Sequence, residues 1–192
     1  METWLWAAAR ALWLLAPILL SAAAHGFVLR FDLMRPLKQP MDFGLSLGGV
    51  RLFGDNKTWR AFVVAVIAGA VGTTLQRAIA DELPARLISD HGALAAPVLG
   101  ALIGAGAILG ELPNSFIKRR ARIAPGSTAG GPLGAGFYLL DQIDLVIVTW
   151  PLIWPFVDAD WRMVVASMVL AATLHPLVSL IGYLGGARKT AR

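Results

Sequence analysis

The chain has 192 residues, of which 57% are hydrophobic and 15% charged, with a mean hydropathy of +0.65 and a formal net charge of +5. A soluble domain of this length cannot bury so much apolar surface, because at this size a large share of the chain stays exposed. The composition therefore excludes an ordinary soluble fold, and the absence of cysteine excludes disulfides and thiolate metal sites.

Five apolar segments are each long enough to cross the roughly 30 Å hydrocarbon core of a bilayer as a helix. In chain order they are Trp4–Ala24, Trp59–Ala80, Ala93–Leu112, Phe137–Phe156 and Met163–Leu184. We therefore predict an all-α integral membrane protein, in which one membrane domain, residues 1–192, forms a bundle of about five transmembrane helices.

The first segment has some features of a cleaved signal peptide. Ala22-Ala23-Ala24 resembles a cleavage site, but the chain starts with Glu2 and no basic region, so we predict that the segment stays as a membrane helix. Arg10 is costly inside it, because a charge at the middle of the bilayer costs roughly 2.5–3.5 kcal/mol on insertion scales. Either Arg10 reaches outward to the interface, or the span begins near Ala11 and runs on to Leu29.

The first connection, residues 25–58, is rich in proline and glycine, which predicts a compact loop with short strands or helices. Lys57 lies at its end, just before the second segment. A lysine there can contact a phosphate, together with backbone N–H groups of the helix start, or it can contact a lipid headgroup. The Gly-x-x-x-x-Gly-Lys-[Ser/Thr] spacing of a P-loop is absent.

The third segment contains Gly100-x-x-x-Gly104 and Gly106-x-x-x-Gly110, a spacing that lets helix backbones approach closely. Glu111 closes this segment, where it either joins the carboxylates of the fourth segment or marks the end of the helix. The connection that follows, residues 113–136, is first basic and then glycine-rich. Its residues 126–136 either wrap a triphosphate through backbone amides or form a flexible linker.

Asp141 and Asp144 are three residues apart near the start of the fourth segment, so a helix places both on one face. Carboxylates at membrane depth are costly unless they are paired, hydrated or bound to a cation. Oxygen ligands of this kind suit Mg²⁺. The alternative is ion pairing with the basic run Lys118–Arg120.

The three histidines, His25, His91 and His175, are scattered along the chain, and we predict no histidine metal site. His175 precedes Pro176, where we expect it to satisfy backbone groups freed by a kink.

Thirteen of the 17 basic residues lie in regions that five crossings place on one side of the membrane. These residues are Arg30, Arg35, Lys38, Arg51, Lys57, Arg60, Lys118, Arg119, Arg120, Arg122, Arg188, Lys189 and Arg192. The positive-inside rule makes that side cytoplasmic. We predict a multi-pass protein of the inner or plasma membrane, with the N-terminus outside and the C-terminus and loops 25–58 and 113–136 in the cytoplasm. The positive charge then reports topology and proximity to anionic headgroups and phosphates, and we expect no nucleic acid partner.

Five short motifs, in this order, resemble the CDP-archaeol synthase family, membrane cytidylyltransferases related to CDP-diacylglycerol synthases. They are Pro40-Met41-Asp42, Gly54-Asp55-Asn56-Lys57-Thr58-Trp59-Arg60, Gly110-Glu111, Ser115-Phe116-Ile117-Lys118-Arg119-Arg120 and Asp141-Gln142-Ile143-Asp144. Ser-x-x-Lys-Arg followed by Asp-x-x-Asp is specific in combination. The chain departs from the family pattern at Asn56, where glycine is frequent, at Glu111, where aspartate is usual, and in a longer glycine-rich stretch.

The resemblance implies Mg²⁺-dependent transfer of CMP from CTP to a lipid phosphate, with Mn²⁺ as a substitute ion. The products are pyrophosphate and a CDP-lipid of the archaeol or diacylglycerol type. It implies metal ligands at Glu111, Asp141 and Asp144, and catalytic roles for both aspartates and for Lys57, Lys118 and Arg119. The nucleotide- and phosphate-binding residues implied are Asp55, Asn56, Thr58, Arg60, Ser115 and Arg120. CTP, the lipid phosphate and membrane lipids are the expected partners, and the oligomeric state stays open, a homodimer included.

Two other classes compete with this interpretation. A small transporter or scaffold with intramembrane carboxylates predicts no nucleotide dependence and leaves the Ser-x-x-Lys-Arg string unexplained. Another lipid-phosphate enzyme is the second alternative, but the Asp-Gly-x-x-Ala-Arg string of CDP-alcohol phosphatidyltransferases is absent.

Overall fold

The computed structural model describes residues 3–92, 94–124, 127 and 130–184. Its five long helices are α1 (Trp4–Arg30), α2 (Trp59–Ile79), α3 (Ala96–Arg120), α4 (Gly131–Ile153) and α5 (Trp161–Leu184). A hairpin of two short strands, β1 (Ser46–Leu47) and β2 (Val50–Arg51), lies between α1 and α2. Helices α1 to α4 are long and apolar enough to cross a membrane, and α5 contributes a shorter apolar stretch. The predicted helical membrane bundle is confirmed.

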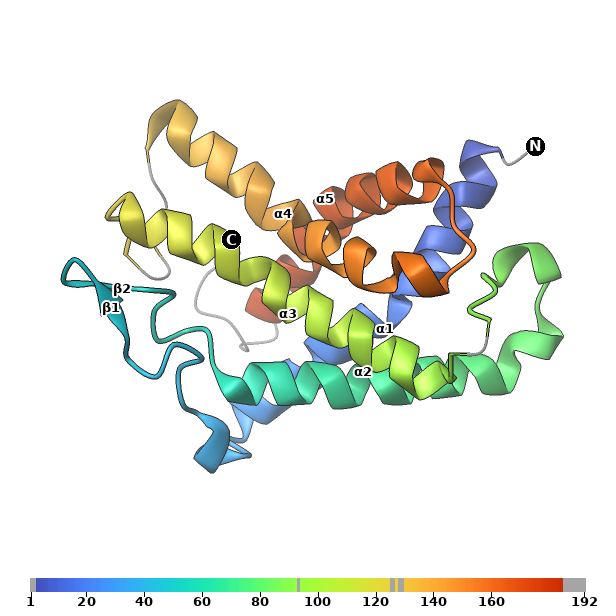
Figure 1. Ribbon diagram of the computed structural model, residues 1–192, viewed down its shortest axis with the longest axis horizontal. Coiled ribbons are helices and arrows are strands. Elements are labelled where there is room, and N and C mark those ends of the chain that lie inside the picture. Colours follow the sequence, from blue (N-terminus) through green and yellow to red (C-terminus); the bar gives the residue numbers. More distant parts are fainter. Residues whose placement is uncertain (1–2, 93, 125–126, 128–129, 185–192) are drawn as a thin grey trace.

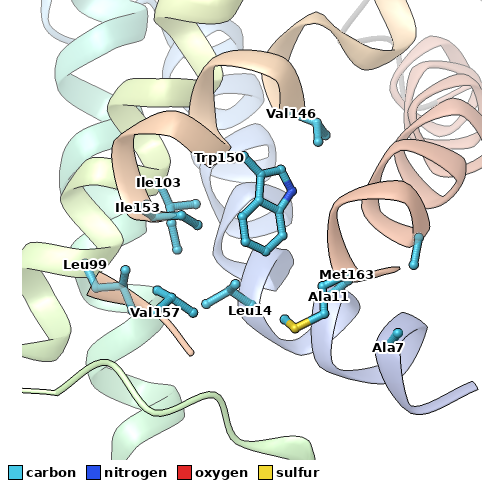
Figure 2. Packing of buried hydrophobic residues seen from close by; sticks show 11 residues of the cluster. Ala7, Ala11, Leu14, Leu99, Ile103, Val146, Trp150, Ile153, Val157 and Met163 are labelled. Carbon is cyan, nitrogen blue, oxygen red and sulfur yellow. The ribbon is translucent and has the colours of Figure 1, made fainter. Parts of the chain in front are cut away.

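Helix α3 is the centre of the bundle, with its most extensive contacts to α2 on one side and to α4 on the other. Helix α1 packs against α2 and α5 (Figure 1). The hydrophobic core lies where α1, α3, α4 and α5 meet, around the buried side chains of Trp150, Ile103 and Met163 (Figure 2). The indole N–H of Trp150 donates to Ser167 at 2.7 Å, so the one polar atom of this large side chain is satisfied.

Glycines let α3 approach both of its neighbours, as their spacing predicts. A Cβ at Gly100 would lie 2.1 Å from the carbonyl oxygen of Gly69 in α2. A Cβ at Gly110 would lie 2.3 Å from the carbonyl oxygen of Asp144 in α4. The first pair of glycines in α3 therefore faces α2, and the second pair faces α4.

Three helices extend beyond the predicted apolar spans, and α1 does so as the alternative span to Leu29 predicts. Helix α1 runs to Arg30 instead of Ala24, α3 runs to Arg120 instead of Leu112, and α4 begins at Gly131 instead of Phe137. The predicted spans end where a histidine, a proline or a glycine interrupts the apolar run, whereas helical hydrogen bonds continue through these residues, even past Pro113. The two predicted loops are consequently shorter, and the basic string Ser115–Arg120 lies on a helix.

The end of the bundle opposite the hairpin is held together by Arg10. Its guanidinium donates to the carbonyl oxygen of Asp158 at 2.5 Å and to Ser89 at 3.5 Å. The backbone N–H of Asp158 donates to the carbonyl oxygen of Asp90 at 2.7 Å, which joins the second and fourth connections. Arg10 therefore reaches outward to polar loops, and the apolar part of α1 follows it.

Parts of three predictions lie outside the described residues. They are much of the glycine-rich stretch before Gly130, the tail with Arg188, Lys189 and Arg192, and the side chain of His175.

Candidate functional site

The candidate site lies at the hairpin end of the bundle, where the first loop meets α3 and α3 meets α4 (Figure 1). Arg120, at the end of α3, holds the hairpin. Its guanidinium donates to the carbonyl oxygens of Leu47, Val50 and Arg51 at 2.6, 2.7 and 2.7 Å. Arg120 therefore attaches the loop to α3 through main-chain carbonyl oxygens of the loop.

Asp42 organises the inside of this loop. Its buried carboxylate accepts hydrogen bonds from Arg51 at 2.6 Å and from the backbone N–H groups of Gly44, Phe53 and Gly54 at 3.0, 3.0 and 3.3 Å. Burial alone would raise the pKa of Asp42, but the hydrogen bonds from Arg51 and the three backbone groups lower it to about 2. The charged carboxylate thus holds the chain that leads to Lys57 in a fixed path.

Lys57 lies directly before α2, in a backbone that is locked on both sides. The N–H of Met41 donates to the carbonyl oxygen of Lys57 at 2.7 Å, and the Thr58 hydroxyl caps α2 by accepting from the N–H of Ala61 at 3.3 Å. The ammonium of Lys57 forms an ion pair with Glu111 of α3. Burial disfavours this ammonium, but the surrounding carboxylates, Glu111 foremost, raise the pKa of Lys57 above its ordinary value.

The two predicted aspartates meet the third helix through an asparagine. The Asn114 amide donates to Asp141 at 2.6 Å and to Asp144 at 3.0 Å, so one side chain of α3 bridges both carboxylates of α4. Lys118, one helical turn further along α3, forms an ion pair with Asp141. The close approach at Gly110 brings the two helices near enough for these contacts. Glu111, Asn114 and Lys118 therefore form one face of α3 that meets Asp141 and Asp144.

Among the described residues, no three Asp, Glu or His side chains form a ready-made metal cluster. The donor atoms nevertheless suit a hard cation. Asp144 is 6% exposed, and its Oδ1 and the Oδ1 of Asn114 are buried without a hydrogen-bond partner in the described part of the chain. Buried oxygens left unsatisfied are costly, and carboxylate and amide oxygens are the ligands of Mg²⁺. The residues present therefore fit the predicted ion.

Arg60, predicted to bind nucleotide, and Arg119, predicted to be catalytic, both contact the protein itself. Arg60, which is 4% exposed, donates to Asp32 at 2.9 Å and to the carbonyl oxygen of Leu33 at 3.1 Å. The hydrogen bond from Arg60 lowers the pKa of Asp32. Arg119 donates to the carbonyl oxygen of Ile123 and closes the end of α3.

The remaining residues predicted to bind nucleotide are split between the surface and the helix interior. Asp55 pairs with Arg51 at 2.6 Å at the surface, and Asn56 is exposed. Ser115 is buried on α3 beside Asn114.

Neither Asn114 nor the Asp42–Arg51 pair is among the site residues predicted from the sequence. The spacing Glu111-x-x-Asn114-x-x-x-Lys118 follows the helical period and could have identified the first. No local signal pairs Asp42 with Arg51, because their contact depends on the fold of the loop.

Comparison with known proteins agrees with this geometry. A family description, CarS-like CDP-archaeol synthase, matches residues 9–190. A CDP-archaeol synthase of Halorubrum lacusprofundi is 33% identical over 77% of this chain and 78% of its own length. One from Halobacterium salinarum is 37% identical over 78% of this chain and 81% of its own.

A solved structure presented as an intramembrane enzyme for archaeal membrane lipid biosynthesis superposes with a TM-score of 0.60. It has 26% sequence identity and covers 86% of this chain and 89% of its own. These matches favour an enzyme over the transporter or scaffold alternative. The chain therefore belongs to the CDP-archaeol synthase family and is a membrane CTP-dependent cytidylyltransferase that acts on a lipid phosphate.

Proposed function

We propose that this enzyme transfers CMP from CTP to the phosphate of a dialkyl lipid of the archaeol type in a Mg²⁺-dependent reaction. The observation that carries the proposal is the convergence of Lys57, Lys118 and three acidic side chains around Asn114. Alternating cations and carboxylates suit a polyphosphate with its counter-ion. The relatives are CDP-archaeol synthases, which supports archaeol as the lipid.

In the reaction, an oxygen of the lipid phosphate attacks the α-phosphorus of CTP. The new P–O bond forms as the bond from the α-phosphorus to the bridging oxygen breaks, and pyrophosphate leaves with the electron pair. The attacking oxygen is already anionic, so no covalent protein nucleophile is required. The protein has to align two anions that repel each other and to neutralise the leaving group.

The roles follow from the contacts. Lys57 and Lys118 each form an ion pair with a carboxylate, and each ammonium can exchange that carboxylate for a phosphate oxygen. Asp141, Asp144 and Glu111, with the amide oxygen of Asn114, would hold Mg²⁺. When bound, the ion would supply charge neutralisation to the phosphates of the nucleotide. Asn114 orients both aspartates toward the same point.

We infer that the site faces the cytoplasm, because most basic residues lie at this end. Since the chain has no cysteine, a Ser46→Cys variant provides a single label on the hairpin. It should resist an impermeant maleimide in intact cells and react after permeabilisation. Labelling in intact cells would show that the hairpin faces the outside of the cell.

The test of function is incubation of purified protein with CTP, Mg²⁺ and a panel of lipid phosphates, with detection of pyrophosphate and CDP-lipid. We expect turnover with the dialkyl ether phosphate, loss on chelation, and recovery with Mg²⁺ or Mn²⁺. Faster turnover of a diacylglycerol phosphate would reassign the lipid. Full activity in excess chelator would show that the reaction does not require a metal ion.

A further inference from the structure

A cavity of about 720 Å³ opens beside the candidate site. Its wall is formed mainly by α1, from Ala11 to Arg30, together with α5 and short parts of α2, α3 and α4. The volume lies within the roughly 300–1,000 Å³ of typical ligand pockets. Many wall residues are alanines, so the space exists because side chains there are small.

The wall is apolar apart from one end. The hydroxyl of Ser21 donates to carbonyl oxygens at 3.0 and 3.1 Å, and that of Ser167 donates to Val164 at 2.7 Å, so both are satisfied by the protein. The titratable side chains of the lining are His25, Arg30 and Glu111. All three belong to the hairpin end, where α1 continues past the apolar span.

Glu111 belongs to both the cavity and the site. It lines the cavity and forms the ion pair with Lys57. The apolar space is therefore continuous with the cluster of carboxylates and lysines. Arg30 lies at the junction and adds a guanidinium, a group whose flat fork of donors matches the oxygens of a phosphate.

We propose that the cavity holds a hydrocarbon chain of the lipid phosphate substrate, with Arg30 binding its phosphate next to Glu111 and Lys57. This assignment rests on the proposed function, because it places the second substrate of that reaction. A chain in the bilayer is already out of water, so moving it into the cavity adds little hydrophobic free energy. The cavity thus selects the shape of the chain and aligns the headgroup, and Arg30 is a specificity residue for lipid and not for nucleotide.

The chain-binding part is tested by filling the cavity. Ala171 of α5 lines it, and its neighbour Ala172 is outside the lining. Ala171→Phe should lower kcat/KM about tenfold or more for a long-chain lipid phosphate and leave a short-chain, water-soluble phosphate unaffected. Ala172→Phe should affect neither. Equal losses with long and short chains in Ala171→Phe would overturn the placement of the chain.

The headgroup part is tested at Arg30. Arg30→Ala should raise the KM for lipid phosphates of either chain length about tenfold or more, the loss expected of a charge-assisted hydrogen bond, while the KM for CTP stays constant. Arg30→Lys should recover part of the loss, and Arg35→Ala, on an exposed neighbouring arginine, should behave as the parent. A raised KM for CTP instead would assign Arg30 to the nucleotide.

Binding can also be measured without turnover. Ala22→Cys places a single thiol in the lining, and Ala24→Cys places one outside it. In detergent, a long-chain lipid phosphate should slow maleimide labelling at position 22 and not at position 24. Equal protection by phosphatidylcholine would show a general lipid site and overturn the assignment to substrate. Protection in a protein that fails to consume CTP would support the cavity while rejecting the proposed function, so the two failures are distinguishable.

Discussion

Four basic side chains at the hairpin end of the bundle fall into two groups with different partners. Lys57 and Lys118 form ion pairs with the carboxylates of Glu111 and Asp141. Arg119 and Arg120 donate to main-chain carbonyl oxygens. A carboxylate partner can be exchanged for a phosphate, whereas a set of carbonyl partners fixes the backbone. The comparison therefore separates charges available for substrate from charges that hold the site in place, although all four lie in or beside the same motifs.

The largest effect should follow from neutralising Asp141 and Asp144. Asp141 pairs with Lys118, and both aspartates are proposed ligands of the bound cation. Asp141→Asn should abolish CDP-lipid formation, and Asp144→Asn should impair it severely. The melting temperature of Asp144→Asn should equal or exceed that of the parent, because removal of a buried charge relieves its desolvation. Activity and thermal unfolding, both measured without Mg²⁺ and with it, check this.

Asp81→Asn is a matched control, since Asp81 is exposed and pairs with Arg77 at the other end of the bundle. Near-parental turnover in Asp141→Asn would falsify the role of this carboxylate.

The next largest effect should follow from removing a lysine whose carboxylate partner can be exchanged for a phosphate. Lys118→Ala deletes one charge-assisted contact to phosphate, worth about 1.5–3 kcal/mol. The KM for CTP should rise about ten- to a hundredfold, with unchanged hydrogen exchange in the hairpin. Lys38→Ala, which removes an exposed lysine paired with Asp32, should leave both quantities as in the parent. Unchanged steady-state kinetics in Lys118→Ala would place Lys118 with the structural group.

Arg120→Ala should show the opposite pattern. Three carbonyl oxygens of the hairpin lose their donor, so the free energy of local opening should fall by at least about 1.5 kcal/mol. Amide exchange of residues 46–51 should accelerate, and Arg120→Lys should restore little of the protection because an ammonium lacks the planar fork. Constant amide exchange together with a raised KM for CTP would show that Arg120 binds nucleotide directly. That result would contradict its assignment to the charges that hold the site in place.

The last effect concerns Asp42, which supports the loop from inside. Its pKa is lowered from 3.8 to about 2, so the charged form stabilises the folded loop above pH 4, and this contribution is lost as the pH falls from about 4 toward 2. Asp42→Asn should lower loop stability near neutral pH by about 2 kcal/mol. Hydrogen exchange of residues 42–54 across this pH range measures it. A parent whose loop stability did not change between pH 5 and pH 2.5 would contradict the assignment.

Hydropathy alone predicts the five helices, because apolar length is a property of each segment by itself. The ends of α1 and α3 differ from the predicted spans, since both helices continue past a residue that interrupts the apolar run, His25 in α1 and Pro113 in α3. The family motifs identify Lys57, Lys118, Asp141 and Asp144, and the structure brings all four to one place. They do not distinguish Arg120 from Lys118, because partners such as the carbonyl oxygens of Leu47 and Val50 come from a distant loop.

The contact at Gly110 has a consequence for sequence variation. A single added methyl group there would meet the backbone of Asp144 at 2.3 Å and push α4 away from α3. A substitution with no charge and no contact to substrate would then separate Asn114 from the carboxylates that it bridges. In a saturation mutagenesis screen scored by growth, position 110 should tolerate as few replacements as position 144, and alanine at Gly130, where an added Cβ meets nothing within 4 Å, should pass unnoticed.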